Sequence, residues 1–150
     1  MRFPGYHAAP VATGGGYPHA GSADRGGQAV SESDEQREIV AWFRSEYPQY
    51  AMCLRVSQSE GKKGGGRSAA IAWSKRTAMG VVKGESDIAI LLKRGEFGSL
   101  LIEHKAENGQ HKTTPAQLEY IRHHNAVGNC AVVTRGVEMA KAAIRQYMAG

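Results

Sequence analysis

Two short apolar runs, one that begins with an acidic residue and one that ends in charged residues, constrain the fold of this chain more than any other feature. The runs are DIAILL (87–92) and SLLIEHK (99–105), and the segment KRGEFG joins them. Apolar runs of this length on either side of a glycine-containing connection predict an antiparallel hairpin. Charged side chains are costly to bury unless they are paired or used. Asp87, Glu103 and Lys105 therefore either mark where the strands leave the core or belong to a site.

The register of the hairpin brings these charges together. If the hairpin is centred near Gly95, Asp87 lies opposite Glu103, with their Cβ atoms ~5 Å apart. Because side chains alternate along a strand, Lys105 shares this face, and the other face carries the apolar residues Ile88, Ile90, Leu100 and Ile102. Two carboxylates this close repel each other unless a cation lies between them, and Mg²⁺ held by one or two carboxylates and water meets that need.

Lys105 gains a chemical role if a metal ion is held here. An ammonium group beside the ion can help to deprotonate an attacking water, and it can stabilise negative charge that develops on a phosphate. A solvated ion pair between Glu103 and Lys105 at the end of the strand is the competing interpretation, because so short a pattern recurs by chance.

The rest of the chain predicts a mixed α/β domain over residues 31–150. Periodicity and end signals indicate four helices outside the hairpin, at 32–47, 68–79, 113–127 and 136–148, and two further strands, at 52–57 and 130–134. This order predicts a mixed β-sheet flanked by helices. Residues 1–30 are rich in Gly and Pro and lack hydrophobic periodicity, so we expect a flexible tail whose role the sequence leaves open.

Local signals support several of these elements. Ser33 and Gln36 have capping-box spacing for the first helix, and Thr114 followed by Pro115 predicts the start of the third. Gly80 and Gly128 are expected to end the second and third helices. In the strand at 52–57, the alternation of apolar residues predicts one half-buried face made of Met52, Leu54 and Val56.

Composition limits the class of protein and its partners. The 150 residues suit one domain, and 19 Lys and Arg against 14 Asp and Glu give a net charge of +5, which favours a polyanionic partner such as nucleic acid. Cys53 and Cys130 lack metal-site spacing, so we expect reduced core thiols. No apolar run approaches ~18 residues and the N-terminal residues lack a signal-peptide pattern, so we expect a soluble cytoplasmic protein without a membrane partner.

The ordered set of motifs resembles the VRR-NUC domain. The set consists of Glu32 with Gln36, KGESD ending at Asp87, IEHK (102–105) and Gln117 within TTPAQ. The segment GRSAAIAWSKRTAMGVVKGESDI (66–88) is similar to the basic helix, glycine and acidic motif of that family. The VRR-NUC domain is a branch of the PD-(D/E)xK nuclease superfamily, found in phage and bacterial stand-alone proteins and in the Fanconi-associated nuclease.

The resemblance implies a restriction-endonuclease-like core that hydrolyses DNA phosphodiesters with Mg²⁺ or Mn²⁺. Small stand-alone members act as homodimers on branched DNA such as Holliday junctions, in bacterial or phage-infected cells. Asp87 and Glu103 match the metal carboxylates, Lys105 the catalytic lysine, Glu32 the helical acid and Gln117 the helix glutamine near the site. Ser86 departs from the family proline. His104 replaces an apolar residue, although its backbone carbonyl could still bind metal.

Several assignments keep an alternative. Glu35 could replace Glu32 as the helical acid, and we prefer Glu32 because it lies one turn before Gln36 on the same helix face. Gln117 has capping-box spacing to Thr114, so it could serve only as a cap. The adjacent pair His123 and His124 points about 100° apart on a helix, which is poor for joint chelation, so we interpret it as helix surface.

The basic residues are expected either to form a solvated face or to contact DNA phosphates without reading sequence. They are Lys62, Lys63, Arg67, Lys75 and Arg76. The sequence therefore predicts a metal-dependent, structure-selective DNA endonuclease. The alternatives are a nickase or flap endonuclease of the same superfamily and, from another class, a DNA-binding module without turnover.

Overall fold

The computed structural model describes residues 30–57 and 67–150. All of the predicted tail except Val30 lies outside these residues, as do Lys62 and Lys63. Within the described residues, no helix is long and apolar enough to cross a lipid bilayer.

The predicted hairpin forms the centre of the sheet. Its strands are β2 (Ile88–Ile90) and β3 (Leu100–Lys105), which run antiparallel with Ile88 opposite Ile102 and Ile90 opposite Leu100. This is the register predicted from a centre at Gly95. Gly95 itself has a φ of 52°, a conformation that glycine adopts without steric cost.

The hairpin belongs to a four-stranded mixed sheet with the order β1-β2-β3-β4. β1 (Leu54–Val56) pairs antiparallel with β2, and β4 (Cys130–Arg135) pairs parallel with β3. A parallel pair requires a crossover connection, and the helix α3 (Pro115–Ala126) supplies it. The predicted order of elements and the mixed sheet are confirmed.

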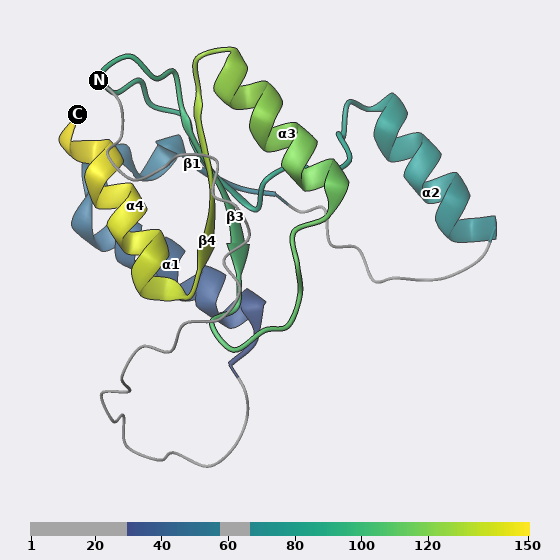
Figure 1. Cartoon of the computed structure of the whole chain (residues 1–150), viewed down its shortest axis with the longest axis horizontal. Coiled ribbons are helices and arrows are strands. Elements are labelled where there is room, and N and C mark those ends of the chain that lie inside the picture. Colours follow the sequence, from purple (N-terminus) through teal and green to yellow (C-terminus); the bar gives the residue numbers. More distant parts are fainter. Residues whose placement is uncertain (1–29, 58–66) are drawn as a thin grey trace.

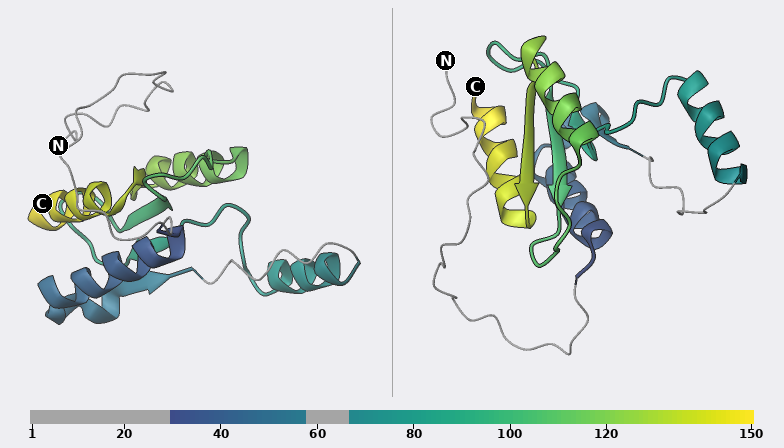
Figure 2. Two further views of the ribbon diagram at one scale, coloured as in Figure 1. Left: turned by 90° about the horizontal axis from the view of Figure 1, so that it is seen from below. Right: turned by 45° about the vertical axis from the view of Figure 1, so that its right-hand side comes forward.

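Helices cover both faces of the sheet (Figures 1 and 2). α1 (Glu32–Glu46) and α4 (Val137–Ala149) lie on one face, where the core is formed by Ile39, Phe43, Ile88, Ile90, Leu100, Ile102, Cys130, Ala140, Ile144 and Tyr147. α3 lies on the other face, and the Asn125 side chain ties it to β4 through the backbone N–H and carbonyl of Ala131, at 2.8 and 3.0 Å. The apolar side of the hairpin is therefore buried as predicted, and the charged side faces α3.

The helix α2 (Arg67–Ala78) stands apart from the sheet and the other helices (Figure 1). Gly80 follows it with a φ of 93°, which agrees with the predicted helix end. Its apolar side chains Ile71 and Trp73 are exposed. The hydrophobic core is therefore built without side chains from α2.

Two local predictions are wrong. The first helix is capped by Ser31 and not by Ser33, because Ser31 has the extended conformation of an N-cap and its hydroxyl accepts from the N–H of Asp34 at 3.2 Å. Met52 lies in a 3-10 helix, η1 (Pro48–Cys53), that begins at the proline, so its side chain is 99% exposed and not half-buried in a strand.

Removal of core volume from α4 tests the buried face. We expect Ile144→Ala to lower the free energy of unfolding by about 2–5 kcal/mol, because this fully buried side chain would leave a cavity. Gln146→Ala on the exposed side of the same helix should change it by less than about 0.5 kcal/mol. Urea denaturation measures both variants, and equal losses would contradict the assignment of the core.

Candidate active site

Asp87 immediately precedes β2, and its side chain, in place of a backbone carbonyl, bonds to β3 where the pairing of β2 with β3 ends. The backbone N–H of His104 donates to Asp87 Oδ2 at 2.8 Å, and the backbone carbonyl of Asp87 accepts from the N–H of Ser57 at 2.8 Å. The carboxylate therefore satisfies a strand N–H that continued pairing would have given to a backbone carbonyl. This bond holds Asp87 beside the last residues of β3.

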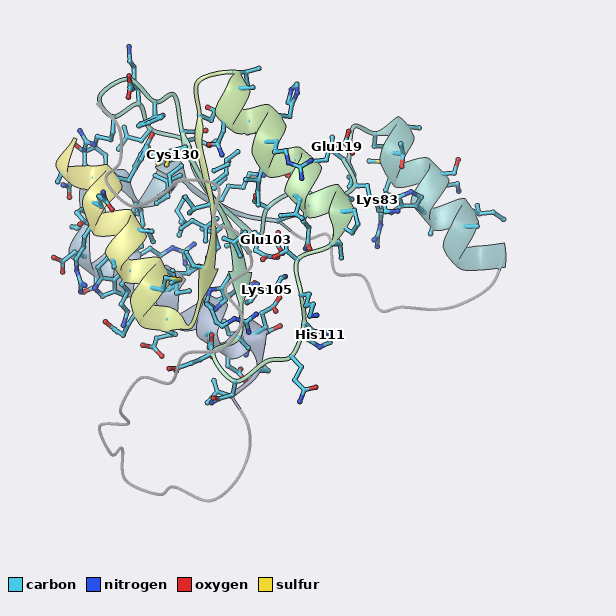
Figure 3. The ribbon with its side chains drawn as sticks, in the orientation of Figure 1. Lys83, Glu103, Lys105, His111, Glu119 and Cys130 are labelled. Atoms are coloured by element: carbon cyan, nitrogen blue, oxygen red, sulfur yellow. The ribbon has the colours of Figure 1, made fainter. Side chains whose placement is uncertain are left out.

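Glu103 is the centre of the polar cluster on that side. Its side chain is buried, and Oε1 accepts from Lys105 Nζ at 2.5 Å and from Gln117 Nε2. The other oxygen, Oε2, is buried and has no hydrogen-bond partner among the described residues. Figure 3 shows Glu103 and Lys105 next to each other on β3. The side chains of Glu103, Lys105 and Gln117 thus converge from two elements.

Gln117 caps α3 and also contacts the cluster. Its Oε1 accepts from the backbone N–H of Thr114 at 2.8 Å, and the hydroxyl of Thr114 accepts from the N–H of Gln117 at 3.3 Å. This capping box fixes the side chain at the N-terminus of α3. The remaining Nε2 group donates to Glu103. The predicted start of the helix at Pro115 is confirmed, and the cap aims the amide at the carboxylate.

Gly84 allows the segment before Asp87 to approach α3 closely. Its φ is +82°, and a Cβ atom at this position would lie 2.5 Å from the carbonyl carbon and oxygen of Ala116 and 2.8 Å from the N of Gln117. Only glycine avoids that overlap. The acidic motif and the helix glutamine are therefore held in direct backbone contact.

Burial sets the electrostatics of the cluster. It raises the pKa of Glu103 to about 7, with the Lys105 hydrogen bond acting in the opposite direction and the nearby charges of Asp87 and Glu32 raising the pKa further. Burial alone would lower the pKa of Lys105, but the hydrogen bond to Glu103 and the surrounding acids outweigh it and raise that pKa. Extra positive charge at Glu103 would favour its ionised form.

The two acids of α1 have different surroundings. Glu35 is buried, with Oε2 2.8 Å from Nε2 of His104 and Oε1 accepting from the backbone N–H of Glu107 at 3.0 Å. Glu32 is half-buried, and its charge acts on both Glu103 and Lys105. Glu32 is thus the α1 acid beside the cluster, whereas Glu35 is bound to His104.

The network around Glu35 is the feature beside the site that sequence reasoning missed. His104 is fully buried, and its other ring nitrogen, Nδ1, lies 3.1 Å from the hydroxyl of Thr134 on β4. One signal was present, because Glu35 precedes the buried Ile39 and Phe43 at intervals of four residues. An acid on the buried stripe of a helix needs a buried partner, and His104 is that partner.

Among the described side chains, the predicted basic residues Lys75 and Arg76 lie on α2 and not in the cluster. Lys75 is exposed and Arg76 half-buried on α2, and Arg67 begins that helix. His123 is exposed, and the His124 Nδ1 atom lies 3.1 Å from Asn129 Nδ2. Among the described residues, no group of three or more His, Cys, Asp or Glu side chains is close enough together to hold a metal ion.

Comparison with known proteins identifies the domain. No protein-family model and no curated protein matches the sequence. A solved structure described as a VRR_NUC domain protein matches with a TM-score of 0.66 and 28% sequence identity, covering 81% of this chain and 91% of the other. The chain carries a VRR-NUC domain. The match covers most of both chains, so the resemblance and the restriction-endonuclease-like fold predicted from the sequence are confirmed.

A VRR-NUC domain is a nuclease-type domain, which gives the buried cluster a chemical context. Asp87, Glu103, Lys105 and Gln117 come from the motifs that matched the family, and the structure gathers them at one end of β3. The same end of the sheet carries Glu32, whose charge reaches the cluster.

The raised pKa of Glu103 predicts a pH-dependent stability. Between its ordinary value of 4.5 and about 7, the folded protein keeps a proton that the unfolded chain has released. The free energy of unfolding should therefore fall as the pH rises through this window, by at most about 1.4 kcal/mol per pH unit. Without divalent ions, Glu103→Gln should reduce this slope in urea denaturation, and the exposed control Glu38→Gln should keep it. An unchanged slope in Glu103→Gln would contradict the assignment.

The contact at Gly84 can be tested against a second glycine. Gly84→Ala and Gly80→Ala both force alanine into a positive-φ conformation, which costs about 1–3 kcal/mol. Only Gly84→Ala also places a Cβ against α3, whereas nothing lies within 4 Å of the Cβ position at Gly80. Gly84→Ala should therefore be the more destabilising variant in thermal or urea unfolding. Equal losses of stability in the two variants would show that α3 shifts to accommodate the added Cβ without a free-energy cost.

Proposed function

We propose that this chain is a Mg²⁺- or Mn²⁺-dependent DNA endonuclease that cuts branched DNA such as Holliday junctions. The observation that carries the proposal is the state of Glu103: two donors share one of its oxygens, and the other is buried without a hydrogen-bond partner among the described residues. An unpartnered buried carboxylate oxygen is costly unless something else occupies it. A divalent ion is the partner that also suits the neighbouring Asp87 charge.

The residues present fit such an ion. Asp87 and Glu103 would hold it, with Glu32 assisting directly or through water and the backbone carbonyl of His104 as a further oxygen. Mg²⁺ is commonly bound by one or two protein carboxylates together with water, so two acids suffice. When bound, the ion would polarise a phosphate oxygen and promote ionisation of the attacking water.

The chain's own residues would do the rest of the chemistry. Lys105 stays cationic beside Glu103, so its ammonium can orient the attacking water and stabilise the negative charge that develops on the phosphate. Water adds to phosphorus as one P–O ester bond breaks, and the water's proton ends on the leaving oxygen. Gln117 fixes Glu103, and the His104 N–H fixes Asp87, so both carboxylates are oriented before DNA binds.

The remaining parts of the proposal rest on the resemblance to the family. We propose a homodimer and phosphate contacts from Lys62, Lys63, Arg67, Lys75 and Arg76. Light scattering gives the mass in solution. A panel of linear, nicked, flap and four-way-junction DNA distinguishes a junction endonuclease from a nickase or flap endonuclease.

Two variants separate catalysis from DNA binding. Asp87→Asn removes one charge that would hold the ion and keeps the shape of the side chain, so cleavage should fall by at least about a hundredfold while DNA still binds. Lys105→Ala should lose cleavage to a similar extent. Cleavage is measured with Mg²⁺ or Mn²⁺, and binding by gel shift with Ca²⁺.

Matched controls come from residues of the same types that lie outside the cluster. Asp34→Asn and Lys141→Ala alter residues in surface ion pairs and should cleave like the unmodified protein. Full cleavage by Asp87→Asn would contradict the mechanism. DNA binding without cleavage of any substrate by the unmodified protein would favour a binding module.

A further inference from the structure

The segment Ala106–Thr114, called the rim loop here, borders the cluster at both of its ends. Lys105 immediately precedes it and Gln117 lies within the first turn of the helix that follows, and both side chains donate to the same oxygen of Glu103. Both ends of the rim loop are therefore fixed next to Glu103. The exposed side chains of the loop lie at the border of the site.

Arg135 holds the rim loop in one shape. From the end of β4, its Nη1 atom donates to the carbonyls of Ala106 and Gly109 at 3.0 and 2.6 Å, and its Nη2 atom donates to the carbonyl of His111 at 3.2 Å. The N–H of Gly109 also donates to the carbonyl of Ala106 at 3.1 Å. A planar guanidinium that bonds three carbonyls fixes their relative positions, so the loop is preorganised.

Glu107 is exposed but is anchored at the start of the rim loop. Its N–H donates to Glu35, and its side chain lies against Gly136, where an added Cβ would come within 3.2 Å of it. Beyond the turn, Gln110, His111 and Lys112 form a run of three exposed residues. Their backbone N–H groups make no hydrogen bond to any part of the chain that the structure describes. Figure 3 shows His111 on the stretch of chain between Lys105 and α3.

We propose that the rim loop binds the phosphate backbone of DNA next to the scissile phosphate, through His111 and Lys112, with Arg135 as the positioning residue. A phosphate accepts hydrogen bonds and does not donate them. The loop matches it, because Arg135 binds the carbonyls of Ala106, Gly109 and His111, while the backbone N–H groups of 110–112 and the side chains of His111 and Lys112 remain as donors. This inference rests on the proposed function, since it takes the substrate of the Glu103 cluster to be DNA.

Binding without turnover tests the rim loop separately from catalysis. The probe is a fluorescent four-way DNA junction in Ca²⁺, measured by anisotropy at several salt concentrations. His111→Ala/Lys112→Ala should bind about tenfold more weakly, and its log–log salt slope should be smaller by about one, because a phosphate contact has been lost. The matched control is Lys93→Ala, an exposed lysine before the hairpin turn, at the opposite end of β3 from Lys105, which should bind like the unmodified protein.

Arg135→Ala tests the positioning role. It should accelerate hydrogen exchange of the amides in 106–112 and weaken DNA binding, while the His111 and Lys112 side chains remain. Arg135→Lys should restore only part of the binding, because one ammonium cannot bond all three carbonyls in the same plane. Unchanged binding by Arg135→Ala despite faster exchange would overturn the positioning role.

The outcomes separate the rim loop from the nuclease. Unchanged affinity and salt slope in the double variant would overturn the rim loop, even if the unmodified protein cleaves DNA. Weaker binding by the double variant would support the rim loop even if no substrate is cleaved, and in that case only the catalytic proposal fails. Absence of DNA binding by the unmodified protein would overturn the rim loop outright.

Discussion

The hydrogen bond from the backbone N–H of His104 to the carboxylate of Asp87 organises the rest of the site. It satisfies a strand donor at the point where β2 stops pairing with β3, so β3 continues beyond its antiparallel neighbour with only β4 beside it. The side chains of Glu103 and Lys105 then have room for partners from α3 and α1. If β2 continued to pair with β3 as far as Lys105, its own residues would occupy that space.

Alternation along β3 separates two polar networks that lie only one residue apart. Glu103 and Lys105 face Gln117, whereas His104 faces Glu35 and Thr134 on the side covered by α1. The His104 network has all its side-chain donors and acceptors paired within the fold, which is what a structural network requires. The Glu103 network keeps one oxygen without a protein partner. A buried ion pair is weak evidence for stability, so this incomplete network is more readily explained by function.

The sequence predicted those features that depend on neighbouring residues. The hairpin register followed from a turn centre and strand alternation, and the capping box at Thr114 followed from a spacing of three residues. Local ambiguity explains the error at Ser33, because Ser31 offers the same hydroxyl two residues earlier and the pattern alone does not rank them.

Features that depend on the pairing of β3 with β4 were beyond sequence reasoning. The crossover brings Thr134 to His104 and Arg135 to the carbonyls of the rim loop, across roughly a full βαβ unit of chain. A single sequence gives no register for a parallel pair, because no turn fixes it.

The same pairing explains why one short strand can carry the whole site. β3 begins at the hairpin and ends at the rim loop, and each of its last three residues has a side-chain partner: Glu103 is held by α3, His104 by α1, and Lys105 by Glu103 on the same strand. The carbonyl of Lys105 also accepts from the N–H of Gly136, at 3.0 Å, so β4 holds the backbone at the same point. A strand end whose residues are held by α1, α3 and the end of β4 moves little when a ligand binds. Adaptation to the shape of the proposed DNA substrate would therefore fall to parts outside this strand, and α2, which has few contacts with the sheet, is one such part.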